Sequence, residues 1–368
     1  MGAGGEKRLL IATWDGAGNL PPILALIEAF ARRGHEVHVI GHDVQKSQIE
    51  AAGGAFIAFE TAPQWDQGAG VARSLGADPA TMVRVFAETS RDDILAAANR
   101  LHPAAVLIDC MLPAALNATG RAGYETVALV HALYSFFASP ASMGGACGRA
   151  IDRADLALGL SYAGFDKDAR FRPNLVFVGP ARPEIAGAEW PRRAPERPLV
   201  VVSMSTGLQG AEGVQKKRLQ CVCDALAGLE VEALVTTGRG IPPDSLTAGS
   251  NITLERRVAH DLVLPQADLL ITHAGHGTVM AGLTFGVPML CLAPLADQPM
   301  NAARVAELGL GEALDPAASR ADIAQAISRL LGDPAVKERS RAFAAAVALE
   351  PGIEMAVELV EALAVRGR

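Results

Sequence analysis

The chain has 368 residues, half of them hydrophobic, which is enough to bury two cores of ordinary size. Its formal net charge of −7 and its pI near 5.7 argue against nucleic acid or an anionic membrane surface as the main partner. The first apolar run, Leu9–Thr13, is too short for a signal peptide or a membrane span, so a cytoplasmic protein without a membrane span is expected. The five scattered cysteines lack the spacing of a disulfide framework or a zinc site.

The N-terminal half alternates short apolar runs with longer amphipathic stretches, which is typical of β-α-β units in a parallel sheet. Strands are predicted at Leu9–Thr13, Glu36–Gly41, Ala104–Ile108, Thr126–Val130, Leu156–Leu160 and Leu175–Val178, and helices at Pro22–Arg33 and Pro79–Asn99. Gly34 follows the first helix and is expected to end it. These elements predict a first α/β domain over residues 1–181.

Proline and charge are dense between Gly179 and Pro198, and residues 182–198 are interpreted as a linker with solvated arginines. The alternation then restarts, which predicts a second α/β domain over residues 199–350. Its strands are predicted at Leu199–Met204, Glu232–Thr237, Ile252–Leu254, Leu269–Thr272 and Met289–Leu292, and its helices at Gly213–Leu229, Ala302–Leu308, Arg320–Leu331 and Lys337–Ala348. A last helix, Ile353–Ala364, follows a Pro-Gly break.

A glycine turn after one buried strand of the second half is suited to bind a diphosphate. The run His273-Ala-Gly-His-Gly-Thr278 lies between the strand Leu269–Thr272 and a helix that is predicted to begin near Thr278. Gly275 and Gly277 carry no Cβ, so the backbone can turn sharply and its N–H groups can approach an anion. The positive end of the helix points at the same place.

A polar pair follows the next buried strand. Asp297 and Gln298 come after the apolar run Val287–Pro294, so they are expected at the carboxyl end of that strand, where open α/β sheets bind their ligands. A carboxylate accepts hydrogen bonds from two hydroxyls, and an amide both donates and accepts them. The pair is therefore suited to grip a polyhydroxylated ring such as a sugar.

These residues resemble the nucleotide-sugar-dependent glycosyltransferases of family 1, of the bacterial natural-product type. The match runs through His273, Gly275, Gly277, Thr278, Gly286, Pro288, Pro294, Asp297, Gln298 and Asn301. The resemblance implies an α/β fold of the GT-B class, with two Rossmann-like parallel-sheet domains that face each other across a cleft. It also implies that residues 351–368 form a C-terminal helix that packs back on the N-terminal domain.

The resemblance assigns the donor to the second domain. It implies that the diphosphate is bound by His273, Gly275, Gly277, Thr278, Ser205 and Thr206, and the sugar by Asp297 and Gln298. Arg257, Val258 and His260 stand where the family has a segment that stacks on the nucleobase, and a guanidinium plane can also stack. Ala281 replaces a glutamate that grips the ribose in many members, which leaves the donor open between a TDP-sugar and a UDP-sugar.

The general base is the point where the chain departs most from the family. Asn19 stands at the position of the usual histidine base, and an amide cannot take a proton near neutral pH. Asp109 matches the aspartate that normally orients that histidine and is the first candidate for the base, followed by Asp15 and then His131. In a fourth alternative no strong base is needed, and Asn19 only positions the hydroxyl of an acidic, phenolic acceptor.

By the same resemblance, the first domain would bind the acceptor. Candidate wall residues are Trp14, Trp65, Phe86, Tyr134, Phe136 and Phe137. His131 is either a wall residue or the base, and the run Tyr134–Phe137 is either part of a pocket or plain packing.

The resulting prediction is an inverting, metal-independent hexosyltransferase. It would move a sugar from a TDP- or UDP-linked donor to a hydrophobic small molecule, such as a polyketide or aromatic natural product, as in antibiotic biosynthesis. No cofactor and no metal ion are expected, because a helix N-terminus can supply the positive field. The alternatives are a nucleotide-sugar epimerase of the same fold and a catalytically silent nucleotide-sugar-binding protein, and a homodimer is one option for the assembly.

Overall fold

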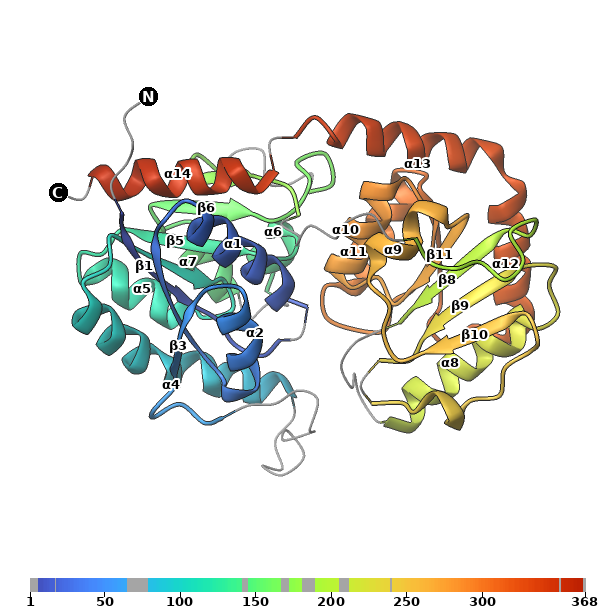
Figure 1. Cartoon of the computed structure of the whole chain (residues 1–368), viewed down its shortest axis with the longest axis horizontal. Helices are drawn as coiled ribbons and strands as arrows, with labels where there is room; N and C mark the ends of the chain where they lie inside the picture. The colour runs from blue at the N-terminus through green and yellow to red at the C-terminus, as the bar shows by residue number, and fades with distance from the viewer. Residues whose placement is uncertain are drawn as a thin grey trace. The chain divides into compact units, whose positions relative to one another are not determined.

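The computed structural model describes residues 6–16, 18–64, 79–140, 145–166, 172–180, 189–204, 212–238, 240–350 and 352–366. The chain divides into two compact units (Figure 1). The first joins Met1–Pro183 with Glu350–Arg368, and the second is Glu184–Leu349. Each unit is built around one parallel β-sheet. Among the described residues, no helix is long and apolar enough to cross a membrane.

The sheet of the first unit has seven strands in the order β3-β2-β1-β4-β5-β6-β7, and all its neighbouring strands are parallel. The strands are β1 Arg8–Ala12, β2 Glu36–Gly41, β3 Ala55–Ala58, β4 Ala105–Asp109, β5 Thr126–Val130, β6 Leu156–Gly159 and β7 Leu175–Phe177. Strand β3 was not predicted, because this short edge strand has partly exposed residues and lacks a buried apolar run.

The first unit also contains the helices that flank this sheet. They are α1 Leu20–Arg32, α2 Lys46–Ala51, α4 Pro79–Leu101, α5 Pro113–Arg121, α6 Tyr134–Ala138, α7 Ala146–Ile151 and α14 Gly352–Arg366, with a 3₁₀ helix at Asp43–Gln45. Helix α1 begins with two prolines in its first turn, where the missing N–H costs nothing. It ends before Gly34, whose φ of +82° is a left-handed conformation that suits glycine.

Alternate residues of this sheet supply two separate cores. Leu10 and Ile108 belong to the core beneath α4 and α5, whereas Leu9 and Ile11 belong to the core beneath α1 and α14. The C-terminal helix α14 lies beside α1 in Figure 1, and its apolar residues are buried in the second core. Its helix surface also carries Glu354 and Glu361, which form ion pairs with Arg33.

The sheet of the second unit has six strands in the order β10-β9-β8-β11-β12-β13, again all parallel. They are β8 Leu199–Ser203, β9 Glu232–Thr236, β10 Ile252–Glu255, β11 Leu269–Thr272, β12 Met289–Leu292 and β13 Gly311–Leu314. The helices are α8 Glu212–Leu226, α9 His260–Val263, α10 His276–Phe285, α11 Gln298–Glu307, α12 Arg320–Gly332 and α13 Pro334–Val347, with 3₁₀ helices at Pro243–Ser245 and Leu264–Gln266. The edge strand β13 was not predicted, because it too is only partly buried.

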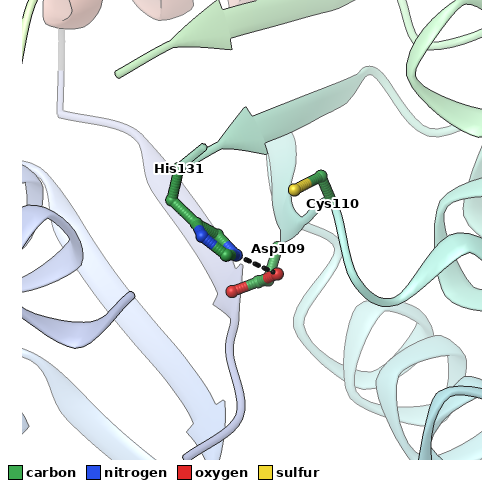
Figure 2. A group of neighbouring side chains, drawn as sticks. All are labelled: Asp109, Cys110 and His131. Atoms are coloured by element: carbon green, nitrogen blue, oxygen red, sulfur yellow. Dashed lines mark hydrogen bonds and ion pairs between the residues drawn. The ribbon is translucent and has the colours of Figure 1, made fainter. Parts of the chain in front are cut away.

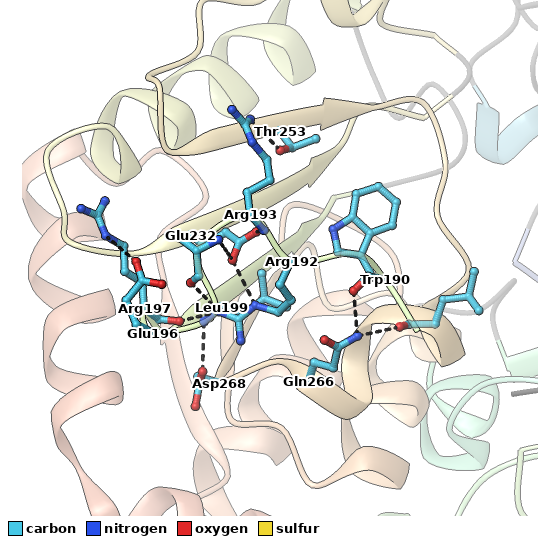
Figure 3. A network of polar contacts seen from close by, with 12 residues as sticks. Trp190, Arg192, Arg193, Glu196, Arg197, Leu199, Glu232, Thr253, Gln266 and Asp268 are labelled. Atoms are coloured by element: carbon cyan, nitrogen blue, oxygen red, sulfur yellow. Dashed lines mark hydrogen bonds and ion pairs between the residues drawn. The ribbon is translucent and has the colours of Figure 1, made fainter. Parts of the chain in front are cut away.

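Residues 189–198, which were predicted to be part of the linker, belong to the second unit and are bonded to the start of β9 (Figure 3). The prediction that the linker arginines are solvated is wrong for Arg192, whose Nε donates to Glu232 at 3.0 Å. The backbone N–H groups of Arg193 and Ala194 donate to the same carboxylate. Burial alone would raise the pKa of Glu232, but these donors outweigh it and lower the pKa. The carboxylate therefore anchors this segment to the start of β9.

Candidate functional site

The loop after β11 holds His273 in a buried position at the carboxyl edge of the second sheet. Its Nδ1 lies 3.5 Å from the backbone oxygen of Ser203, the last residue of β8. Burial lowers the pKa of His273 from its usual 6.5 to about 4, so the ring is neutral at pH 7. If the Nδ1 proton is directed at Ser203, Nε2 carries the lone pair. Donation from Nε2 to a phosphate oxygen then requires the other tautomer or a protonated ring.

The two glycines of this loop have different physical roles. A Cβ on Gly275 would lie 2.4 Å from Nε2 of His273, so only glycine leaves room for the imidazole. A Cβ on Gly277, which is exposed, would meet no described atom within 4 Å. Helix α10 begins at His276 rather than near Thr278, so the Gly277 N–H lies in the first helical turn. The space beside Gly277 can therefore accept a ligand that takes hydrogen bonds from backbone amides.

Asn301 joins the loop after β11 to the loop after β12. Its Nδ2 donates to the Ala274 backbone oxygen at 3.0 Å and to the Asp297 carboxylate at 2.8 Å, and the residue is fully buried. Ala274 has a φ of +60°, a conformation that costs a non-glycine residue about 1 kcal/mol or more. Its N–H donates to Thr272 Oγ1 at 3.1 Å. These bonds hold the strained loop and orient the Asp297 carboxylate.

The predicted sugar-binding pair differs in exposure. Asp297 is the N-cap of α11 and is partly exposed. Gln298 is buried, and its Oε1 lies 3.4 Å from the backbone N of Leu295. The amide oxygen of Gln298 thus faces its own loop, and direct binding of a sugar by Gln298 stays a prediction. Asp297 keeps a position in which its carboxylate can meet sugar hydroxyls.

The segment expected at the nucleoside precedes the short helix α9. Arg257 is exposed and Val258 is partly exposed. His260 is the first residue of α9, and its Nε2 lies 3.1 Å from Ser203 Oγ. Ser203 therefore connects His260 with His273, a link that sequence spacing could not reveal because the end of β8, the start of α9 and the loop after β11 supply the three residues. Ser205 and Thr206, the other predicted donor residues, lie outside the described residues.

A second polar group lies at the carboxyl edge of the first sheet, where β4 and β5 end (Figure 2). Asp109, the last residue of β4, is 0% exposed. It accepts hydrogen bonds from Asn19 Nδ2 at 2.7 Å, Met111 N at 2.9 Å and His131 Nε2 at 3.0 Å. Three donors are the partners that an ionised carboxylate requires when it is buried. The prediction that Asp109 itself deprotonates the acceptor does not fit this geometry.

Asn19 is held from several sides. It is 2% exposed, its Nδ2 also donates to the Trp14 backbone oxygen at 3.0 Å, and its Oδ1 accepts from Gly16 N at 3.1 Å. Although Asn19 occupies the N-cap of α1, its side chain does not cap the helix. These contacts contradict the interpretation that Asn19 positions an acceptor hydroxyl. Its amide instead ties the first loop to Asp109.

His131 differs from the other predicted catalytic residues in keeping exposed surface. Its side chain is 16% exposed, and its ring meets the edge of Phe137 at a centroid distance of 5.7 Å. Asp15, the second candidate, is buried, and its N–H donates to His42 Nδ1 at 3.0 Å. Burial lowers the pKa of His42 to about 4, so that ring accepts as a neutral imidazole.

Of the six aromatic residues predicted to line an acceptor pocket, three belong to the core. Tyr134, Phe137 and Trp14 are buried in the core beneath α4 and α5, so the prediction that they form pocket walls is wrong. Phe136 is partly exposed and packs against Phe137 at 5.4 Å. The short helix α6 produces this contrast, because it turns one side of the run toward the sheet. Trp65 and the side chain of Phe86 lie outside the described residues.

Asp109, Cys110 and His131 bring three potential metal ligands within 4.8 Å of one another (Figure 2). Burial, together with the nearby charge of Asp109, holds the pKa of the Cys110 thiol well above its usual value. The thiolate that a metal ion prefers is therefore disfavoured. Because Asp109 already accepts three hydrogen bonds, these residues form a hydrogen-bonded pair beside a neutral thiol rather than a typical metal site.

The fold is shared with solved glycosyltransferases. The glycosyltransferase of kitacinnamycin matches with a TM-score of 0.81 and 21% identity, covering 98% of this chain and 99% of that one. The glycosyltransferase VinC, solved in complex with dTDP, matches with a TM-score of 0.71 and 17% identity over 98% of this chain and 100% of that one. The two parallel-sheet units therefore form a GT-B fold.

Comparisons of sequence also find glycosyltransferases. Residues 220–363 match the family profile of the erythromycin biosynthesis protein CIII-like C-terminal domain. The NDP-glycosyltransferase YjiC of Bacillus licheniformis is 29% identical over 52% of this chain and 49% of its own length. The 4'-demethylrebeccamycin synthase of Lentzea aerocolonigenes is 30% identical over 51% and 44%. The matched region thus spans about half the length of these relatives, and over that region the chain is similar to glycosyltransferases.

Proposed function

We propose that the protein is a glycosyltransferase that moves a sugar from a nucleoside-diphosphate donor to a hydrophobic small molecule, with inversion at the anomeric carbon. The observation that carries this proposal is the pair of loops joined by Asn301. One loop offers the open first turn of α10 at Gly277, and the other offers the oriented carboxylate of Asp297. A diphosphate and a sugar are the ligand groups that these two loops suit.

The donor loop is also suited to the departure of a nucleoside diphosphate. Negative charge develops on the leaving phosphate as the glycosidic bond breaks, and the amides and positive end of α10 stabilise it. A bound diphosphate would also favour the protonated form of His273, since an opposite charge raises the pKa of an imidazole. No metal ion is required for this stabilisation, and we propose a metal-independent reaction.

We propose a TDP- or UDP-linked donor and a natural-product acceptor, and similar proteins support the TDP-linked donor and the class of acceptor. VinC is a relative in fold that was solved with dTDP, and one curated relative is a 4'-demethylrebeccamycin synthase. In this chain Ala281 is buried inside α10 and has no group that could hold ribose hydroxyls. We therefore expect a deoxyribose donor to be accepted at least as well as a ribose donor.

Two other functions fit the donor half less well. An epimerase needs acid and base groups around the sugar, and within the described part of the donor loops Asp297 is the one carboxylate placed for it. A catalytically silent binder would not need a histidine–carboxylate pair such as His131 and Asp109 at the edge of the other sheet.

The purified protein should be incubated with TDP- and UDP-sugars and a panel of phenolic and polyketide acceptors, with products followed by mass spectrometry. We expect an acceptor whose mass increases by one sugar, with release of the nucleoside diphosphate. Interconversion of the donor sugar without acceptor product would favour the epimerase. Donor binding without any turnover would favour the silent binder.

A further inference from the structure

We propose that His131 is the general base of the transfer reaction and that Asp109 and Asn19 are positioning residues that act through it. This inference rests on the proposed function. The base is then neither Asp109 nor Asn19, which stand at the positions that the resemblance assigns to this chemistry, but a histidine that directly follows β5.

A general base must be accessible to the acceptor. Asp109 and Asn19 are 0% and 2% exposed, and their polar atoms are bonded to the protein. His131 follows β5, and its side chain keeps 16% of its surface exposed at the same sheet edge. Of these three side chains, only the imidazole therefore presents surface to a substrate.

The contact with Asp109 determines the tautomer of the His131 ring. Asp109 accepts from the Asn19 amide and the Met111 N–H, and an ionised carboxylate has no proton to donate, so Nε2 of His131 is the donor in the 3.0 Å contact. In a neutral ring with its proton on Nε2, the lone pair is on Nδ1. The carboxylate thus fixes which nitrogen is basic and stabilises the imidazolium that forms when a proton is taken up.

Asn19 supports the Asp109 carboxylate from the other side. Its amide donates to the other oxygen of Asp109 and also bonds the loop of residues 13–16. The Asn19 amide is a neutral donor, so it bonds Asp109 without adding a positive charge. A charged donor at this position would compete with the imidazolium of His131 for the carboxylate. The negative charge of Asp109 is therefore available to His131. Phe137, which is almost fully buried, packs against the imidazole and limits its rotation.

In the reaction, Nδ1 of His131 takes the proton of the acceptor hydroxyl. At the same time, the oxygen of that hydroxyl attacks the anomeric carbon of the donor sugar. The new C–O bond forms as the bond from that carbon to the diphosphate oxygen breaks, and the nucleoside diphosphate leaves with the electron pair. The imidazolium later gives its proton to solvent. Atoms and charges balance without any further reactant.

The test compares kcat for graded acceptors in the full-length protein. A His131→Gln variant can still donate to Asp109 but has no basic atom, so its kcat should fall about 100-fold to 10,000-fold with weakly acidic phenols. The loss should shrink toward tenfold or less with 4-nitrophenol, which ionises unaided. His102→Gln, at an exposed turn after α4, is the matched control and should keep its kcat. Affinity for TDP, measured by calorimetry, should be unchanged in both variants.

Asp109→Asn tests the positioning role and keeps the shape of the side chain. We expect kcat to fall more for weakly acidic phenols than for 4-nitrophenol, with the donor KM unchanged. A purely structural residue would instead lower kcat equally for all acceptors. If His131→Gln does not fold, Asp109→Asn still tests whether the His131–Asp109 pair provides the base.

The outcomes separate the two proposals. If the wild type glycosylates acceptors and His131→Gln loses less than tenfold in kcat with weakly acidic phenols, His131 is not the base, although the proposed function stands. An equal loss for all acceptors in the folded variants would also overturn the base assignment. If the wild type itself transfers no sugar, the proposed function fails first.

Discussion

Gly275 gives the sharpest test of the donor loop, because a single methyl group would enter the space of one named ring. In Gly275→Ala the new Cβ would lie 2.4 Å from Nε2 and 2.9 Å from Cε1 of His273. The backbone at this residue, with φ −61° and ψ 139°, suits alanine, so the strain falls on the ring alone. The imidazole must move by roughly 1 Å to reach ordinary contact distance.

This displacement should destabilise the second unit by about 1–3 kcal/mol, the usual cost of overpacking a buried site. Affinity for TDP should fall about 10-fold to 100-fold, or about 1.4–2.7 kcal/mol, because His273 no longer faces the diphosphate. Urea denaturation measures the first quantity and calorimetry the second.

Gly277→Ala is the informative partner, since its Cβ would meet no described atom within 4 Å. We expect stability to be unchanged or raised by up to about 1 kcal/mol, because alanine favours a helix, while TDP affinity still falls. Gly332→Ala, at the end of α12 and also without a described neighbour, should leave TDP affinity unchanged. Unchanged TDP affinity in both Gly275→Ala and Gly277→Ala would refute the assignment of this loop to the diphosphate.

Three further predictions concern residues that support the two sites. Asn301→Ala removes the hydrogen bonds to Ala274 and Asp297, so denaturation should show a loss of about 1–3 kcal/mol of stability. Steady-state kinetics should show a higher KM for the donor. An unchanged KM would contradict the role of Asn301 in orienting the Asp297 carboxylate. Glu232→Ala leaves Arg192 without its carboxylate partner, and urea denaturation should show that the free energy of unfolding falls by about 2 kcal/mol or more. TDP affinity should be unchanged, because Glu232 lies at the start of β9 and the donor loops follow the ends of the strands. Because burial lowers the pKa of His273 from 6.5 to about 4, the unfolded chain takes up the proton first, and His273 stabilises the fold fully above pH 6.5. That stability, up to about 3 kcal/mol, should be lost as the pH falls from 6.5 to 4, and a flat denaturation midpoint over this range would contradict the neutral ring.

Most of the fold could be predicted from the sequence because its strands are buried on both faces. The runs at β2, β5, β11 and β12 were predicted with the bounds that the structure has. The edge strands β3 and β13 were missed, since partly exposed strands carry no continuous apolar run. The short helices α2, α5, α6 and α7 were missed as well, because a single turn or two leaves little periodicity to detect.

The candidate site could be located from the sequence, but the roles within it could not. Sequence placed Asp109 and His131 at strand ends, yet only the structure shows that one is buried and bonded to the other. Similarly, the run Tyr134–Phe137 reads as pocket or packing until the direction of α6 is known. Exposure and hydrogen-bond partners depend on contacts between residues distant in sequence, and these decide which side chain can meet a substrate.

The central claim is that a donor bound at the loops of Gly277 and Asp297 gives its sugar to an acceptor. The most direct measurement counts both products of one reaction: glycosylated acceptor by mass spectrometry and released nucleoside diphosphate by chromatography. Sugar transfer predicts equal amounts of the two in the wild type, and a proportional fall of both in Gly277→Ala. Release of nucleoside diphosphate without glycosylated acceptor, or binding of the donor without either product, would contradict the account.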